Sequence, residues 1–250
     1  MISFNGNNLE SAYLIINRLN KSDAPQRELQ NEVLSFQDGH SVVADFWRSR
    51  SISISGMINA TSAAHLGTLL DTLKGDLSGK EKNLDVDYGG GTRRYVGTMT
   101  ALNAPEEFYN ITHLPYTAQF VCQPFGKETS VTTFSSNDIT ASVETDSITT
   151  TGSYKPQPLI QITVDSATAV TGVSFENTTT GDTISITETI VAGDVLIIDT
   201  ETHKVTLEGT QVDFDGPIPD FVLGLNSFSI EVDSTAHQYD LEITYTPTYL

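Results

Sequence analysis

The 250-residue sequence contains one cysteine, one tryptophan and only 13 lysine and arginine residues, against 32 aspartate and glutamate residues. One cysteine excludes an internal disulfide framework and a cysteine-rich zinc site. With a net charge of −19, the chain lacks the basic surface that binds nucleic acid or anionic membranes. No apolar run approaches the roughly 18 residues of a membrane span, and the N-terminus lacks a signal-peptide pattern. We therefore expect a soluble protein made without a signal peptide, with neither nucleic acid nor membrane as a partner.

The acidic residues are unevenly distributed along the chain. Residues 1–127 carry 11 Lys and Arg against 13 Asp and Glu, whereas residues 128–250 carry 2 against 19. Residues 126–153 lie between the halves, are rich in Ser and Thr, and show little apolar patterning. A composition shift beside such a segment is typical of a domain boundary. We predict two domains, 1–127 and 128–250, with the boundary within about 126–153.

In the first half, local patterns predict strands around one helix. Isoleucines alternate with serines in RSRSISISGMI (48–58), as expected for a strand with one buried face. Residues 61–80 place leucines at helical spacing after a possible Ser or Thr cap, which predicts a helix over about 62–78. KNLDVDY and RRYVGTMTAL, joined at GGGT, and PYTAQFVCQP follow as strands. Cys122 lies on one face of the last strand, which favours a buried structural thiol over a nucleophile.

The second half has a period of two almost throughout. PLIQITV, NSFSIEV and YDLEITYTPTYL place apolar side chains on one face and polar ones on the other. Their joints, such as NTTTGDT and DFDGPIP, are rich in turn-forming residues. Short alternating strands with such turns predict an antiparallel β-sandwich. The fold class we predict is therefore mainly β, with a β-rich N-terminal domain that contains one helix and a C-terminal sandwich.

Few residues form a pattern that predicts chemistry. Asp199, Glu201 and His203 occupy alternate positions, so in an extended chain they share a face and could hold a divalent metal. They fall between two apolar runs that would pair as strands, and a hairpin connection need not keep them together. We interpret them as hairpin residues and expect no metal and no cofactor. No G-x-S-x-G motif is present, and the histidines have no recognisable partners, so we expect no enzyme.

Several short segments, in their order and spacing, resemble the distal tail proteins (Dit) of long-tailed, non-contractile bacteriophages, the siphophages. In the first half these segments are FNGNNL, DGHSVVADFWRSRSISISGMI, the leucine helix, NLDVDYGGGTRRYVGTM and FVCQPFG. In the second half they are TGSYKPQPLIQITV, GDVLIIDTETHKVTLEG and ITYTPTYL. The resemblance covers essentially all 250 residues.

The resemblance implies a structural protein of the virion at the distal end of the tail. It implies a homo-hexameric ring built by N-terminal domains, with galectin-like or carbohydrate-module-like sandwiches projecting outward. The implied partners are the tail tube, the tip hub, and possible tape-measure and receptor-binding proteins. The ring would be a platform in the baseplate for host adsorption. Scaffold proteins of this kind need no metal at residues 193–209.

The charge split and the resemblance together predict where copies meet. Acidic second halves repel one another, whereas the nearly neutral first half sets Arg48, Arg50, Arg93 and Arg94 among acids. We therefore expect the oligomer interface in the first half. Two alternatives from other classes are a carbohydrate-binding module or host-surface adhesin, and a glycan hydrolase. The first needs exposed aromatic platforms, and the second needs a carboxylate pair facing a cleft.

Overall fold

The computed structural model describes residues 1–21, 23–33, 40–105, 112–167, 170–234 and 237–250. The chain divides into two compact units, Met1–Thr129 with Leu250, and Ser130–Tyr249. In the described residues both units are built from antiparallel strands, and the first also contains a helix. The predicted fold class, mainly β with one helix, is confirmed.

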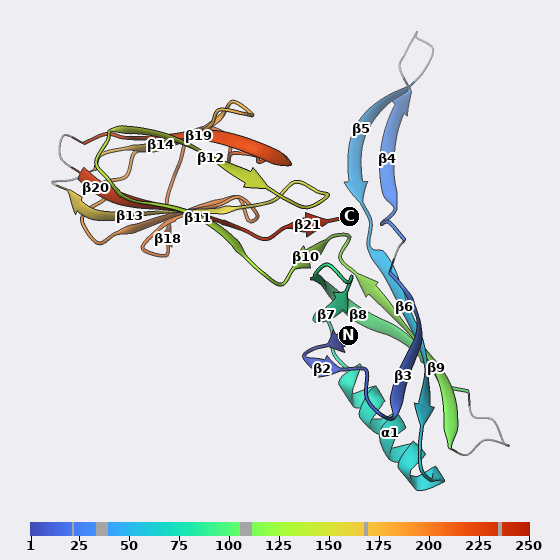
Figure 1. Ribbon diagram of the computed structural model, residues 1–250. Helices are drawn as coiled ribbons and strands as arrows, with labels where there is room; N and C mark the ends of the chain where they lie inside the picture. The colour runs from blue at the N-terminus through green and yellow to red at the C-terminus, as the bar shows by residue number, and fades with distance from the viewer. Residues whose placement is uncertain (22, 34–39, 106–111, 168–169, 235–236) are drawn as a thin grey trace. The chain divides into compact units, whose positions relative to one another are not determined.

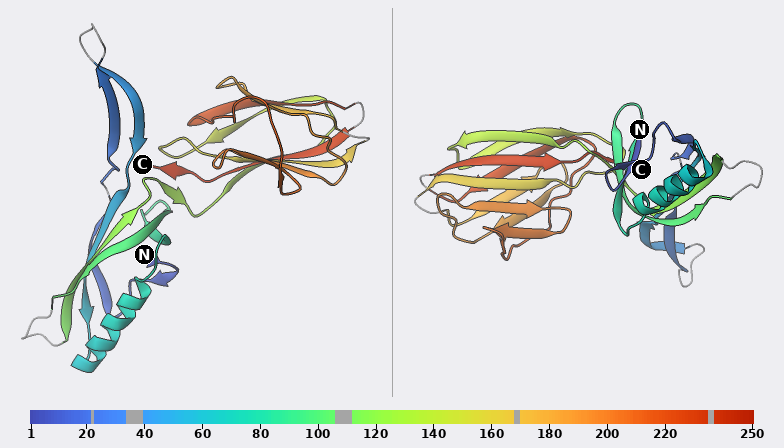
Figure 2. Two further views of the ribbon diagram at one scale, coloured as in Figure 1. Left: turned by 180° about the vertical axis from the view of Figure 1, so that it is seen from behind. Right: turned by 90° about the horizontal axis from the view of Figure 1, so that it is seen from below.

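The first unit is a sheet with a helix on one face (Figures 1 and 2). Its elements are β1 (Ile2–Phe4), β2 (Asn7–Asn8), β3 (Leu14–Asn20), β4 (Arg27–Val33), β5 (His40–Trp47), β6 (Arg50–Asn59), α1 (Ala63–Asp76), β7 (Lys82–Asp87), β8 (Thr92–Asn103), β9 (His113–Cys122) and β10 (Gly126–Glu128). The strand order is β2-β1-β7-β8-β9-β6-β3, and β10 pairs with β8. Strands β4 and β5 form a separate two-stranded ribbon.

Helix α1 begins where the sequence predicts. The Ser62 hydroxyl accepts a hydrogen bond from the backbone N–H of His65, which satisfies one of the free donors of the first turn. Leu73 and Leu77 are buried, and Leu66, Leu69 and Leu70 pack beside them against the sheet. These leucines face the sheet, where alternate residues of β6 and β9 are buried on one face. Cys122 belongs to that face, as predicted, and burial raises the pKa of its thiol to about 11.

The second unit is a β-sandwich of two antiparallel sheets. Its strands are β11 (Thr132–Ile139), β12 (Val143–Thr150), β13 (Leu159–Ala167), β14 (Val173–Asn177), β15 (Asp182–Ile186), β16 (Val195–Asp199), β17 (Lys204–Leu207), β18 (Thr210–Gln211), β19 (Gly224–Val232) and β20 (His237–Tyr245). The short β21 (Thr248–Tyr249) follows β20 and belongs to neither sheet. One sheet has the order β11-β20-β13-β16-β17-β18, and the other has the order β12-β19-β14-β15.

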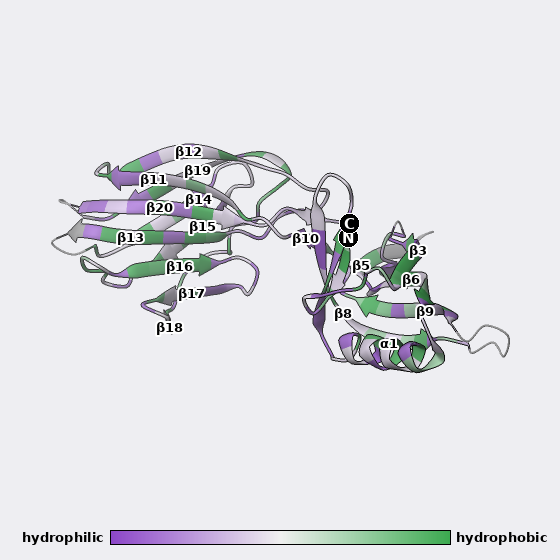
Figure 3. Cartoon of the chain, turned by 60° about the horizontal axis from the view of Figure 1, so that its bottom comes forward, coloured by the Kyte–Doolittle hydropathy of each residue, from purple (hydrophilic) through white to green (hydrophobic). Residues whose placement is uncertain are grey.

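Side chains from both sheets of the sandwich meet in one apolar core. Hydrophobic and hydrophilic residues alternate along strands such as β13 and β20 (Figure 3). The Phe228 ring lies 5.5 Å from the Phe175 ring and 5.4 Å from the Phe134 ring, measured between centroids. Tyr239 and Tyr245 are buried, as their positions in the sequence predict.

The division between the two units, after Thr129, falls within the Ser- and Thr-rich residues 126–153, most of which form strands. They form β10, β11 and β12, and the last two are full strands of the sandwich. Thr and Ser suit the solvent face of a sheet, while Ile139 and Ile148 are buried and anchor each strand to the core. So few apolar positions in each long polar strand give too weak an alternation to be recognised in the sequence.

Candidate functional site

The hairpin of β4 and β5 carries an unusual share of exposed apolar side chains. Leu29, Val42, Val43 and Phe46 are 49%, 50%, 60% and 43% exposed. The two strands pair with each other and, among the described strands, with no other. Sequence analysis did not predict this hairpin, because Leu29 stands alone between polar residues and Val42 and Val43 are adjacent. A two-stranded ribbon has no core of its own to bury such side chains.

Two of the four arginines expected at an oligomer interface are paired within the chain. The Arg48 Nε donates to Glu28 Oε2 at 2.6 Å. The Arg94 guanidinium donates to both carboxylate oxygens of Asp85, at 2.7 and 2.8 Å. These contacts lower the pKa of Glu28 and raise the pKa of Arg94 through hydrogen bonds between opposite charges. The charges of Arg48 and Arg94 are therefore largely balanced by carboxylates within a single chain.

Arg50 is different, because it lies inside the first unit against two tyrosines. Its side chain is 3% exposed, its Nη1 donates to the Tyr95 hydroxyl at 2.9 Å, and its Cζ lies 5.3 Å from the centre of that ring. The Tyr95 and Tyr88 hydroxyls are 2.9 Å apart, and the Tyr88 hydroxyl donates to the Lys21 carbonyl at 3.0 Å. Burial is the main cause that raises the pKa of Tyr88.

The Tyr88 ring also carries two cations. Lys21 Nζ lies 4.2 Å and Arg93 Cζ lies 4.1 Å from its centre. Both distances are within the range of cation–π attraction. Lys21, Arg50, Tyr88, Arg93 and Tyr95 thus form a cation–tyrosine cluster. Sequence analysis singled out Arg50 and Arg93 but missed the tyrosines and Lys21, because the cluster joins residues in or next to β3, β6, β7 and β8, which are distant in the sequence.

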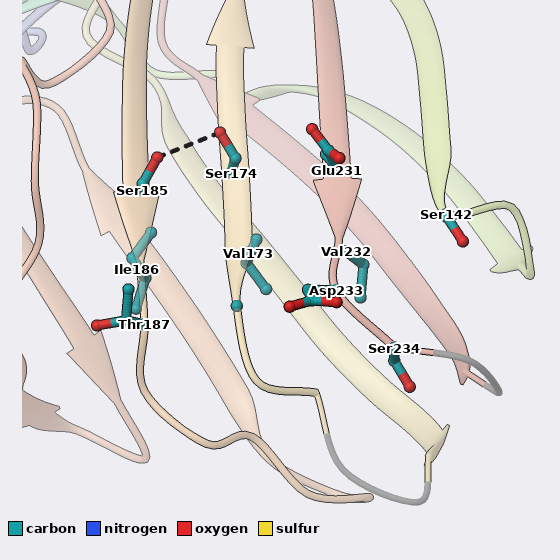
Figure 4. A pocket seen from close by; sticks show the side chains of 11 residues that line it. Ser142, Val173, Ser174, Ser185, Ile186, Thr187, Glu231, Val232, Asp233 and Ser234 are labelled. Carbon is teal, nitrogen blue, oxygen red and sulfur yellow. Dashed lines mark hydrogen bonds between the residues drawn. The ribbon is translucent and has the colours of Figure 1, made fainter.

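The second unit contains a polar groove of about 370 Å³ at one end of the β12-β19-β14-β15 sheet (Figure 4). Buried Val173, Ile186 and Val232 lie beneath it. Its polar lining residues are Ser142, Ser174, Ser185, Thr187, Glu231, Asp233 and Ser234. Ser174 and Ser185 are hydrogen-bonded to each other at 3.4 Å, and Asp233 accepts from the Thr171 hydroxyl. The groove offers hydroxyls and carboxylates but no aromatic side chain on which a sugar ring would stack.

Three aspartates on the other sheet lie close enough to share a cation. One carboxylate oxygen from each of Asp138, Asp165 and Asp240 lies within 4.8 Å of the other two. Among the described residues, this is the group of side chains whose spacing would allow it to hold a metal ion. The Asp138 backbone N–H donates to Asp240 Oδ1 at 2.8 Å. Desolvation, followed by the neighbouring negative charges, raises the pKa of Asp165. Exposed carboxylates often cluster in this way without an ion.

Asp199 is the last residue of β16, and Glu201 and His203 lie in the turn that joins it to β17, as the hairpin interpretation predicts. Asp199 Oδ1 accepts from the backbone N–H groups of Glu201 and Thr202, and Oδ2 accepts from the Thr202 hydroxyl. His203 has a positive φ of 56°, so the chain is not extended there. The ligand atoms of these three residues do not form a group within 4.8 Å.

Comparisons with known proteins identify the family of the C-terminal part and the fold of the chain. Residues 151–249 match the family model described as siphovirus-type tail component, C-terminal domain. The Dit protein of phage SPP1 has the same fold, with a TM-score of 0.76 and 12% identity over 100% of this chain and 98% of that one. Residues 151–249 belong to the family of siphovirus-type tail components. The resemblance seen in the sequence is confirmed.

Other comparisons add less about this tail component. Two baseplate structures of phage P2, in activated conformations with Ca and with Sr, each give a TM-score of 0.41 at 9% identity, over 91% of this chain and 89% of the matched chain. A TM-score of that size does not establish a shared fold. A search of curated proteins returned no match.

Family membership gives a coarse function. The tail component is a structural protein of the phage virion that assembles with other tail proteins. Membership in a structural family indicates a non-enzymatic role. The helix found in the described residues is too short and too polar to cross a membrane.

Proposed function

We propose that six copies of this tail component form a ring at the distal end of the tail. The ring joins the tail tube to the tip hub and is a platform for receptor-binding components. The first unit builds the ring, and the second projects from it. The phage SPP1 protein that shares the fold is described as a paradigm of the hub adsorption apparatus in phages that infect Gram-positive bacteria, which supports the proposal.

The exposed apolar side chains of the β4–β5 hairpin are the observation that carries the proposal. Val42 and Phe46 are 50% and 43% exposed on a ribbon that has no sheet partner among the described strands. Burying such side chains in a neighbouring copy removes apolar area from water and stabilises a contact at about 25 cal/mol per Å². A hairpin that extends to the next copy gives a head-to-tail contact, which closes into a ring when the rotation per copy divides a full turn.

The edges of the sheet in the first unit support the same contact. β2 and β3 end the strand order, so each leaves one row of backbone N–H and C=O groups without a partner among the described strands. Exposed Tyr13 and Ile15 lie beside and within β3, at 42% and 43% exposure. A neighbouring copy that covers this edge would satisfy its backbone groups and bury both side chains.

Charge supports the division of labour between the units. Residues 128–250 carry 19 acids against 2 cations, so copies of the second unit repel one another when crowded round an axis. Projection into solvent separates these charges. The alternative role in sugar binding has less support, because the polar groove of the second unit is lined by no aromatic side chain. The proposal includes no catalytic step.

The test is a matched pair of variants of the full chain. Val42→Asp places a charge on the hairpin, and Val143→Asp makes the same change at 53% exposure on the second unit. Light scattering after size separation, with and without tail-tube or hub proteins, measures the number of copies. We expect wild type and Val143→Asp to form rings visible in negative stain and Val42→Asp to remain dissociated. Equal assembly of both variants, or rings from an isolated second unit, would refute this proposal.

A further inference from the structure

Arg50 is a buried cation that lacks a counter-charge among the described residues of its own chain. Arginine is almost never fully buried unless it is paired, yet Arg50 is 3% exposed and forms no ion pair with any described carboxylate. Taking a charge out of water without a partner opposes folding. By contrast, Arg48 and Arg94 already bind Glu28 and Asp85.

One edge of the Arg50 guanidinium has unused donors. Nη1 is committed to the Tyr95 hydroxyl, whereas Nε is enclosed and has no hydrogen-bond partner. Nε and Nη2 form the side of the guanidinium opposite to that contact. Two parallel N–H groups match the two oxygens of a carboxylate, which gives a short and strong bidentate contact.

The surroundings hold this edge in place. Tyr95 is fully buried, and a Cβ at Gly126 would lie 2.6 Å from its ring, so the ring has no room to turn away. The Tyr95 hydroxyl accepts from Arg50 and donates to Tyr88, whose hydroxyl donates to the Lys21 carbonyl. The hydroxyl protons of Tyr95 and Tyr88 therefore both point away from Arg50. The tyrosines therefore fix the guanidinium but leave its charge uncompensated.

We propose that the Nε–Nη2 edge of Arg50 binds a carboxylate of a second copy of this chain when the ring forms. The inference rests on the proposed ring. A second copy fits because the chain has 32 acids for 13 cations, and each copy in a ring meets the same site. The site adjoins the proposed contact surface, since Arg50 follows Trp47, the last residue of the hairpin, by three positions.

Access to the edge requires a local movement. Arg48 and Ser49 connect β5 to β6 outside any strand, so the hairpin can shift at this link without breaking sheet pairing. Docking of the hairpin on a neighbouring copy would open the edge, and the incoming carboxylate would then supply the missing charge. The buried arginine thereby makes the assembled state more favourable than the single chain.

The experiment compares Arg50→Met with wild type and with Arg94→Met, which removes an exposed pair as the matched control. Light scattering over a concentration series measures self-association, with tail-tube or hub protein added where wild type requires it. We expect association of Arg50→Met to weaken by about tenfold or more, as when one partner of a buried charge pair is lost. In dilute, dissociated protein its Tm should equal or exceed that of wild type, because an unpaired buried charge is gone. Arg94→Met should assemble like wild type.

Arg50→Lys keeps the charge but removes the bidentate edge, and it replaces Arg50→Met where the latter loses its near-ultraviolet circular dichroism. We expect it to associate as weakly as Arg50→Met. Wild-type assembly by Arg50→Met or Arg50→Lys would overturn the inference while leaving the ring intact. A fall of more than about 5 °C in the Tm of dissociated Arg50→Met would also overturn it, because Arg50 would then already be compensated within one chain. Failure of wild type itself to form a ring would instead refute the proposed function.

Discussion

Asn226 in β19 is the residue whose alteration tests the sandwich most sharply. It is fully buried, and its Nδ2 donates to the carbonyls of Val222 and Gly224 at 2.8 and 3.1 Å. Its Oδ1 accepts from the Val222 N–H at 2.9 Å and from Asn177 Nδ2 at 3.3 Å. Asn226→Asp keeps the shape of the side chain but replaces a double donor by an acceptor that faces two carbonyl oxygens.

The cost follows from these contacts. Two donated hydrogen bonds are lost at about 1 kcal/mol each, which leaves the Val222 and Gly224 carbonyls to share the Thr150 hydroxyl as a donor. Ionisation of the new carboxyl in a buried site adds a desolvation penalty, so we expect a total of about 3–5 kcal/mol at neutral pH. For a unit the size of Ser130–Tyr249, this corresponds to a fall in Tm of about 10–20 °C.

Calorimetry of the full chain is the assay. We expect two transitions, one for each unit, with only the transition of the second unit shifted. Exposed Asn7 in the first unit supplies the control, since Asn7→Asp makes the same change of net charge. Burial raises the folded-state pKa of the new carboxyl above its unfolded value, so the difference from wild type should shrink as the pH falls through that raised pKa. A shift below about 1 kcal/mol, or an equal shift of both transitions, would refute the reasoning.

Two further predictions concern the helix and the aspartate group. Leu73→Asp puts a carboxylate at a fully buried position of α1, so the first unit should lose about 4 kcal/mol or more of its free energy of unfolding. In calorimetry the second unit should melt as in wild type. Soluble protein with wild-type stability would contradict the packing of α1. Asp165→Asn relieves like-charge repulsion, so the Tm should rise at pH 7 in the presence of a chelator. Because the folded-state pKa of Asp165 is raised, wild type loses stability as the pH rises through that pKa. The gain in Tm of the variant over wild type should therefore vanish near pH 3.5, about where the carboxyl is protonated in both states. A lower Tm of the variant at pH 7 would show that the charge of Asp165 is compensated in wild type.

Local sequence patterns determined the elements that build each core. The alternation in PLIQITV became β13 with Ile160, Ile162 and Val164 buried, and the leucine spacing became α1. Both follow from geometry within a few residues, since burial of one face requires period two in a strand and period 3.6 in a helix. The turn at 199–204 was also predictable, because two apolar runs flank it at hairpin distance.

Tertiary structure alone decided the arrangements that join distant segments. Asp138, Asp165 and Asp240 meet because β11, β20 and β13 are neighbours and two pairings contain bulges. Arg50 meets Tyr95 across the sheet, and no spacing along the chain records that contact. Strand register is set by packing between elements, so a sequence shows which residues can be buried but not which distant residues they will touch. For the same reason, the sequence identified Arg48, Arg50, Arg93 and Arg94 as a set, and only the structure separated the paired Arg48 and Arg94 from the uncompensated Arg50.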